Sequence, residues 1–286
     1  MVPLQEVDKT GPGRLLAIDV DGTLLRADGE IDPRDRRAVE RARALGVSVT
    51  LATGRDAAFA LPVARALDLD GPLICSDGIA LVSGRTGACL ALFAVALDAA
   101  DRVLACFTES GLAPFVLLFD CAHGEESGHG LLRHLRSWVP ELCLHASLSA
   151  AAGWRREGEI ASLIGVGTED RARAARGAAA RALGGRVELS IFPLSDSGWW
   201  VVLARPAGYS KGDGLSRLAG RLGIARERVA AIGDAHNDLS MLAWAGRSFA
   251  MGHAPPEVRA GATETLVSTE VSGGGVAEAL ARWLGP

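Results

Sequence analysis

Two aspartates close an apolar run near the start of the chain. Residues 15–18 are apolar and read as a strand, and Asp19 and Asp21 follow directly, with Gly22 behind them. In extended backbone, residues two apart project to the same side, so both carboxylates face one way. Two like charges held together are costly unless a cation balances them, and Mg²⁺ is a suitable one. Taken alone, the stretch fits an Asp-Gly turn equally well.

Further along the chain, other polar groups follow apolar runs in the same way. Asp234 and Asp238 offer a second set of hard oxygen ligands after an apolar run. Lys211 stands at the predicted start of a helix, where an ammonium can neutralise a phosphate. Thr53 and the backbone N–H of Gly54 offer neutral donors to phosphate oxygens. Each signal taken singly also fits an ordinary turn, helix cap or surface lysine. Their joint occurrence at strand ends indicates phosphate chemistry.

The first part of the chain alternates strands and helices. After the aspartate pair, the pattern predicts a helix from Asp32-Pro33 to Gly46, a strand over residues 47–52, a helix over 57–67 and a strand over 72–75. Such alternation predicts a parallel sheet with helices on its faces. Ligands bind beyond the carboxyl ends of the strands in these sheets. Asp77 follows the strand over residues 72–75, so we expect it at the same edge as Asp19, Asp21 and Thr53.

The middle of the chain has a different pattern. Residues 79–95 predict a β-hairpin, and further strands follow to residue 204 with few helices between them, including one over 131–138. This predicts an α+β unit with an antiparallel sheet inserted into the first domain. Parallel alternation resumes at Lys211. The expected domains are residues 1–84 with 204–286, and residues 85–203.

Composition narrows the possible functions. The chain has 286 residues, is 49% hydrophobic and carries a net charge of −4, which gives no basic field for nucleic acid. Its five cysteines form no CxxC pair, which argues against a disulfide framework or a thiolate metal site. Cys121, His123, His129 and His134 match no zinc pattern either. No apolar run is long enough to span a bilayer. We therefore expect a soluble, cytoplasmic protein without a membrane partner.

Four segments together resemble the motifs of the haloacid dehalogenase (HAD) superfamily. They are DVDGT at residues 19–23, the strand end at Thr53, Lys211, and GDAHND at residues 233–238. The long insertion resembles the type IIB cap of the Cof-type sugar-phosphate phosphatases, and residues 250–254 and 274–277 resemble that subfamily's C-terminal region. The resemblance implies an α/β fold, with a Rossmann-like parallel-sheet core and an inserted α+β cap domain of type IIB.

The resemblance also assigns roles to the matching residues. Asp19 would be the nucleophile that forms an aspartyl-phosphate, and Asp21 would be the general acid and base. Asp19, the backbone carbonyl of Asp21 and Asp234 would hold Mg²⁺, with support from Asp238. The phosphoryl group would be bound by Thr53, Gly54, Lys211 and Asn237.

Two positions depart from the pattern of this subfamily. Asp77 and His253 stand where relatives commonly carry asparagine. An acid at position 77 adds negative charge beside an anionic substrate, unless it is turned away or paired. The sequence gives no consequence for His253.

The leading hypothesis is a Mg²⁺-dependent phosphomonoester hydrolase that acts on a small phosphorylated metabolite, with sugar phosphates as the expected class. A phosphohexomutase of the same superfamily is an alternative, because such caps also occur on mutases with the same nucleophile. A non-catalytic binding protein on this scaffold is another, although the intact Asp19, Asp21, Lys211 and Asp234 argue against it. We expect a monomer or a homodimer.

Overall fold

The computed structural model describes residues 13–126, 141–194 and 198–285. It divides the chain into two compact units, Met1–Ala91 with Tyr209–Pro286 and Leu92–Gly208. We call the first the core unit and the second the inserted unit. The helix predicted over residues 131–138 lies outside the described residues.

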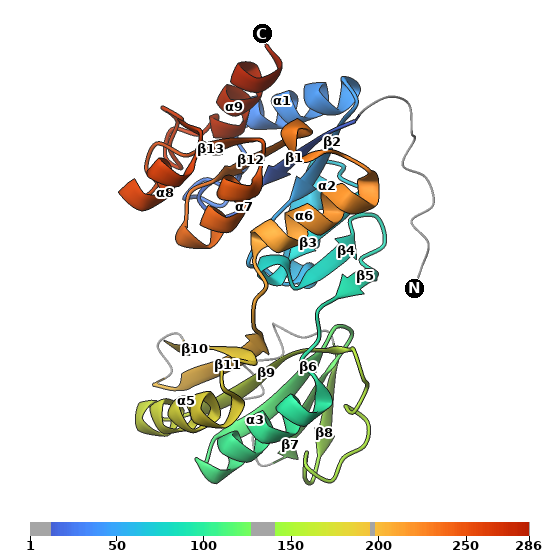
Figure 1. Ribbon diagram of the computed structural model, residues 1–286, viewed down its shortest axis with the longest axis vertical. Coiled ribbons are helices and arrows are strands. Elements are labelled where there is room, and N and C mark those ends of the chain that lie inside the picture. Colours follow the sequence, from blue (N-terminus) through green and yellow to red (C-terminus); the bar gives the residue numbers. More distant parts are fainter. Residues whose placement is uncertain (1–12, 127–140, 195–197, 286) are drawn as a thin grey trace. The chain divides into compact units, whose positions relative to one another are not determined.

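The core unit is built on a five-stranded parallel sheet (Figure 1). The strand order is β14 (Glu264–Thr265), β13 (Arg247–Ala250), β12 (Val229–Gly233), β1 (Arg14–Ile18) and β2 (Val47–Leu51). The strand β1 therefore lies between β12 and β2, and the carboxyl ends of all three meet at one edge. That edge carries the residues predicted to do chemistry.

Beside β2, the chain adds three short strands, β3 (Pro72–Cys75), β4 (Ala80–Ser83) and β5 (Cys89–Leu92). A single parallel bridge between Ala52 and Ile74 joins β3 to the end of β2. The hairpin predicted over residues 79–95 is present as β4 and β5, and its first strand pairs with β3 in antiparallel fashion. This pairing keeps the hairpin with the core unit, so the division in the structure falls after Ala91 rather than after residue 84.

Helices cover both faces of the core sheet. One face carries α1 (Pro33–Ala44) and α9 (Gly275–Leu284), and the other carries α6 (Lys211–Leu222) and α7 (Leu239–Trp244) (Figure 1). Leu15 and Ala17 pack in the same cluster as α6 and α7, as alternation along a strand requires. Two further helices of the described core unit are α2 (Ala57–Ala66) and α8 (Pro256–Gly261).

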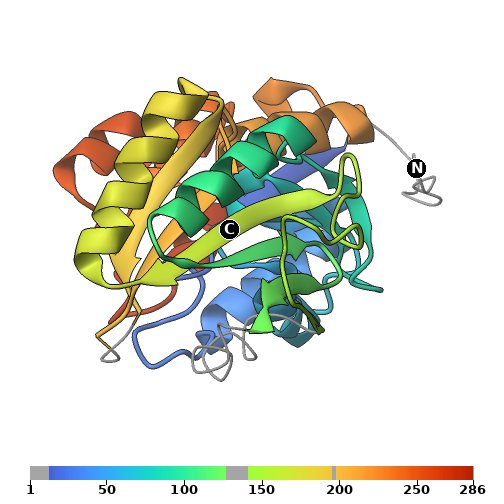
Figure 2. The same cartoon turned by 90° about the horizontal axis from the view of Figure 1, so that it is seen from below.

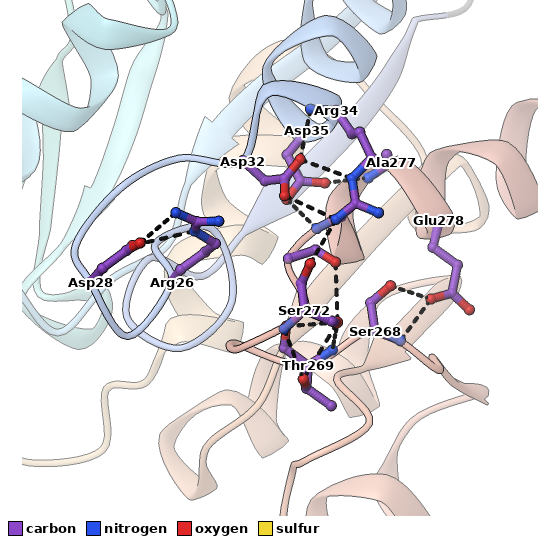
Figure 3. Close-up of polar contacts among 12 residues, drawn as sticks. Arg26, Asp28, Asp32, Arg34, Asp35, Ser268, Thr269, Ser272, Ala277 and Glu278 are labelled. Carbon is purple, nitrogen blue, oxygen red and sulfur yellow. Dashed lines mark hydrogen bonds and ion pairs between the residues drawn. The ribbon is translucent and has the colours of Figure 1, made fainter.

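A group of polar contacts joins α1 to the start of α9 (Figure 3). Asp32 is the N-cap of α1 and accepts from the backbone N–H of Arg34 at 2.8 Å. Asp35, in the first turn of α1, is buried and accepts from the backbone N–H groups of Gly274 at 3.1 Å and Ala277 at 2.7 Å. A carboxylate of α1 thus satisfies the open backbone donors at the N-terminus of α9.

In the described residues, the inserted unit has a six-stranded sheet with two helices on it. The strand order is β10 (Val187–Pro193), β11 (Trp200–Pro206), β9 (Ile160–Gly167), β6 (Ala113–Leu118), β7 (Ala122–Glu125) and β8 (Leu142–His145). All neighbours are antiparallel except β7 and β8. The helices α3 (Leu97–Glu109) and α5 (Glu169–Leu183) lie side by side against this sheet (Figure 2). The expected α+β unit with a mainly antiparallel sheet is confirmed.

No helix in the described ranges is long and apolar enough to cross a membrane. The short 3-10 turns η1 (Ser76–Gly78) and η5 (His236–Asp238) both follow core strands and carry residues of the candidate site.

Candidate active site

The ammonium group of Lys211 lies at the centre of the candidate site. Its side chain is 1% exposed, and Nζ donates to Oδ1 of Asp19 and to Oδ1 of Asp238, each at 2.6 Å. Asp19 follows β1, Asp238 ends η5, and Lys211 is the first residue of α6. Three predicted site residues from distant parts of the chain therefore meet in one buried ion-pair network.

The start of α6 is fixed in place by close backbone approaches. Ser210 caps the helix by accepting from the N–H of Asp213 at 3.3 Å. A Cβ on Gly78 would lie 2.0 Å from the carbonyl oxygen of Ser210, and one on Gly212 would lie 2.6 Å from that of Ser240. Only glycine fits at these two contacts, which set where the Lys211 side chain begins.

The charges of this network shift one another's pKa values. Burial works to lower the pKa of Lys211, but the carboxylates of Asp19 and Asp238 raise it above its usual value, so the ammonium stays charged. Burial, followed by the charge of Asp238, raises the pKa of Asp19 well above its usual value, against the opposing effect of Lys211. Two buried carboxylates share one ammonium group here. A further positive charge nearby would therefore be favourable.

Asp234 adds a third carboxylate to this network. One oxygen each of Asp19, Asp234 and Asp238 lie within 4.8 Å of one another, the only such group of three or more candidate ligands among the described residues. Hard carboxylate oxygens in this number suit Mg²⁺, with water and substrate completing its shell. The donor set therefore fits the predicted ion.

The three acids are engaged to different degrees. Asp238 uses both oxygens, since Oδ1 accepts from Lys211 and Oδ2 accepts from the N–H groups of Asp234 and Ala235, each at 2.9 Å. Asp19 accepts from Lys211 with Oδ1, and its Oδ2 makes no hydrogen bond within the described parts of the chain. Asp238 therefore braces the loop after β12, whereas Asp19 keeps one oxygen available.

Gly22 and Thr23 shape the space around Asp234. Gly22 has a φ of 83°, and a Cβ there would lie 2.6 Å from Oδ2 of Asp234. This position thus requires glycine both for its backbone conformation and for the close approach. The hydroxyl of Thr23 donates to Oδ1 of Asp234 at 2.7 Å. The DVDGT segment therefore positions Asp234 as well as supplying Asp19.

Asp21 lies apart from the acidic group around Lys211. Its side chain is 61% exposed and accepts two hydrogen bonds from Arg55, from Nε at 2.9 Å and from Nη2 at 2.5 Å. The sequence pointed to no partner for Asp21. Arg55 follows the predicted Thr53-Gly54 turn. The ion pair therefore joins the loop after β2 to the loop after β1.

Thr53, Gly54 and Asn237 form the remaining part of the predicted site. Thr53 is fully buried, and its Oγ1 accepts from the N–H of Arg55 at 3.0 Å, which leaves its own proton to donate. The N–H of Gly54 makes no hydrogen bond within the described residues. Asn237 donates through Nδ2 to Oδ1 of Asp77 at 2.9 Å. The acid that departs from the subfamily pattern is thus paired with a predicted phosphate-binding residue.

Asp77 is held in an uncommon backbone conformation. Ser76 and Asp77 have φ values of 50° and 53°, and the N–H groups of these residues donate to the carbonyl oxygens of Arg55 and Thr53. Left-handed backbone at non-glycine residues is costly and clusters at functional sites. This turn ties the ends of β2 and β3 together.

Among the described residues, the cysteines and histidines of the inserted unit form no group of three or more candidate metal ligands. Nδ1 of His123 lies 2.8 Å from Nε2 of His145, and Nε2 of His123 lies 3.5 Å from Sγ of Cys121. His123 therefore turns its two ring nitrogens to different partners, and burial and the neighbouring His145 lower its pKa. His129 and His134 lie outside the described residues.

Comparisons with known proteins agree with this architecture. The family model of the haloacid dehalogenase-like hydrolases matches residues 16–120 and 167–280. An HMP-PP phosphatase of Escherichia coli O8 (strain IAI1) is 28% identical over 280 residues, which cover 95% of this chain and 96% of the relative.

Two solved structures show the same fold. A haloacid dehalogenase-like hydrolase from Bacteroides thetaiotaomicron is 23% identical, covers 94% of this chain and 99% of its own, and has a TM-score of 0.74. A protein described as a HAD subclass IIB sugar phosphatase is 20% identical, covers 96% of this chain and 100% of its own, and has a TM-score of 0.69.

The chain belongs to the haloacid dehalogenase-like hydrolases. The predicted family, the predicted fold class and the prediction that the protein is an enzyme are thereby confirmed.

Proposed function

We propose that this protein is a Mg²⁺-dependent phosphomonoester hydrolase that acts on small phosphorylated metabolites through an aspartyl-phosphate intermediate. The observation that carries the proposal is the buried contact of Lys211 with Asp19 and Asp238, beside the carboxylate of Asp234. This arrangement holds an acid with one available oxygen next to a fixed positive charge. Such a pairing suits attack on a phosphorus atom whose oxygens carry negative charge.

In the first step, Oδ2 of Asp19 attacks phosphorus and the bond from phosphorus to the ester oxygen breaks. Lys211, the hydroxyl of Thr53, the N–H of Gly54 and the side chain of Asn237 bind the phosphoryl oxygens. Asp19, Asp234 and the backbone carbonyl of Asp21 would hold Mg²⁺, which supplies further charge neutralisation at those oxygens. The described residues therefore act mainly by positioning and by balancing charge.

Asp21 handles the proton in both steps. It protonates the leaving alcohol, and it then takes a proton from the water that attacks the aspartyl-phosphate and releases inorganic phosphate. In the structure Asp21 is paired with Arg55. It can donate a proton only when this ion pair opens, so we expect the pair to exchange with substrate during turnover.

Sugar phosphates are the substrate class we favour, because a structural neighbour is described as a sugar phosphatase of subclass IIB. The similarity to an HMP-PP phosphatase, which covers 96% of that relative, supports HMP-PP as a further candidate substrate. The residues of the inserted unit, proposed to be the cap, would select among these substrates. The five cysteines are free thiols, which supports the cytoplasm as the compartment.

The test is phosphate release from a panel of sugar phosphates and HMP-PP, with Mg²⁺ and with EDTA. We expect Mg²⁺-dependent release by the wild type and a loss of at least about 1,000-fold in Asp19→Asn. Asp35→Asn is a matched control, because Asp35 is equally buried but lies under α9, away from Lys211. Equal activity of Asp19→Asn and wild type would exclude Asp19 as the nucleophile.

The same panel separates the alternatives. A phosphohexomutase would release little phosphate and would convert one hexose monophosphate into another, with stimulation by a hexose bisphosphate. A non-catalytic binding protein would show neither reaction but would still bind a phosphorylated ligand.

A further inference from the structure

The imidazole of His253 faces the Asp234 carboxylate from a loop that follows β13. Its Nδ1 accepts from the backbone N–H of Glu270 at 3.2 Å. Because Nδ1 is an acceptor there, the proton of the neutral ring sits on Nε2. That nitrogen is buried and has no hydrogen-bond partner within the described residues. It lies 3.4 Å from Oδ2 of Asp234.

An orphaned buried donor calls for an explanation, because leaving it unsatisfied costs free energy. A carboxylate acceptor, Oδ2 of Asp234, lies 3.4 Å away, and the other oxygen of that carboxylate already accepts from Thr23. Gly22 closes on the same carboxylate from a third direction. Asp234 is therefore surrounded by groups that limit the rotation of its carboxylate.

We propose that His253 is a positioning residue for Asp234: its Nε2–H is the donor available to Oδ2 when the cation binds and, together with Thr23, orients the carboxylate for that divalent cation. This inference rests on the proposed function, because it takes Asp234 as a cation ligand. Side chains that orient metal ligands affect metal affinity even though they do not touch the ion. The sequence shows only that histidine replaces the subfamily's common asparagine at position 253. The contact with Asp234 suggests what this histidine does.

The test compares His253→Phe with His253→Gln in the full chain. Both substitutions remove the acceptor for Glu270, but glutamine keeps an N–H donor near the position of Nε2 and phenylalanine does not. Isothermal titration with Mg²⁺ alone measures the affinity. We expect His253→Phe to weaken Mg²⁺ binding by about tenfold or more, and His253→Gln to remain within about threefold of wild type.

Two further measurements separate positioning from general stability. Thermal unfolding without Mg²⁺ should give similar midpoints for the two variants, because both lose the same anchor on Glu270. In turnover, His253→Phe should recover its kcat at saturating Mg²⁺ and lose it at limiting Mg²⁺. His236→Gln is a control on an exposed histidine that faces Glu257 at 4.0 Å, and it should bind Mg²⁺ as the wild type does.

Equal Mg²⁺ affinity in His253→Phe and wild type would overturn the inference and leave the proposed function intact. Equal weakening in the phenylalanine and glutamine variants would also overturn it, because the donor would then not matter. A wild type that binds no Mg²⁺, with Asp234→Asn behaving identically, would instead contradict the proposed function.

Discussion

The core unit buries carboxylates in two places, and their surroundings differ. Asp19 and Asp238 share the ammonium of Lys211, whereas Asp35 has no lysine and accepts from two backbone N–H groups at the start of α9 (Figure 3). All three side chains are almost completely shielded from water. The first group holds more acids than the lysine can balance and keeps one oxygen of Asp19 available. The second is fully engaged.

Burial of an acid is therefore not by itself a sign of chemistry. Burial raises the pKa of Asp35 to about 6, and it also raises the pKa of Asp19, but only Asp19 accepts a hydrogen bond from a buried ammonium group that it shares with a second buried acid. What distinguishes the candidate site is that its carboxylates outnumber the single ammonium group of Lys211, so that a cation could still bind there. Three substitutions sharpen this contrast.

The largest effect is expected for Lys211→Met, which removes the positive charge and leaves Asp19 and Asp238 buried together. Breaking a buried ion pair from one side costs about 3–5 kcal/mol. We expect a loss of stability of that order, measured by urea unfolding, and a loss of phosphatase activity of at least about 1,000-fold. Lys211→Arg keeps the charge, but its larger planar group does not fit between the two 2.6 Å contacts and should not restore activity.

An active Lys211→Met enzyme would show that the network around Lys211 is structural, like the contacts of Asp35. Retained stability with lost activity would show that the two acids take up a proton in place of the lysine.

An intermediate effect is expected for Asp35→Asn, and it depends on pH. The folded pKa of Asp35 is about 6, above the unfolded value of 3.8, so the folded state holds the proton more tightly. The wild type should therefore lose about 2–3 kcal/mol of unfolding free energy relative to the variant as the pH rises from about 4 to about 6. Urea unfolding at several pH values measures this difference.

Activity at neutral pH should be retained in Asp35→Asn, because this residue touches no group of the candidate site. A pH-independent difference in stability would mean that the two N–H donors fully offset the effect of burial on the pKa of Asp35. A large loss of activity would remove the contrast between the two groups of carboxylates.

The smallest effect is expected for Thr23→Val, a change of similar volume that removes one hydrogen bond to Asp234. The loss of about 1 kcal/mol corresponds to a weakening of Mg²⁺ binding by about three- to tenfold. Titration of Mg²⁺ into the variant measures it. Unchanged affinity would indicate that Gly22 and His253 alone are enough to orient the carboxylate.

Sequence reasoning located the acids and the lysine because each stands at the end of a strand or the start of a helix. Alternation of strands and helices predicts that such ends meet at one edge, so Asp19, Thr53, Lys211 and Asp234 could be assigned together. The parallel sheet and the inserted α+β unit followed from the same alternation and from its interruption after residue 78.

Contacts between side chains on separate loops were not predictable in this way. The pairing of Asp21 with Arg55 and of Asn237 with Asp77 depends on how two loops turn, which no period in the sequence encodes. Asp35 was missed because an acid in an arginine-rich helix reads as exposed, and only its distant partner α9 explains its burial. For His253, the only signal in the sequence was that it stands where relatives commonly carry asparagine.

The order of the core sheet also bears on how the protein is made. The strand β1 pairs with β2 and with β12, but β12 begins at Val229, after the whole of the inserted unit has been synthesised. A growing chain at about 5–20 residues per second needs on the order of ten seconds or more to pass from one partner to the other. During that time one edge of β1 has no native neighbour, and an unpaired apolar strand edge invites aggregation. The nascent chain therefore exposes this edge of β1 until β12 has emerged from the ribosome.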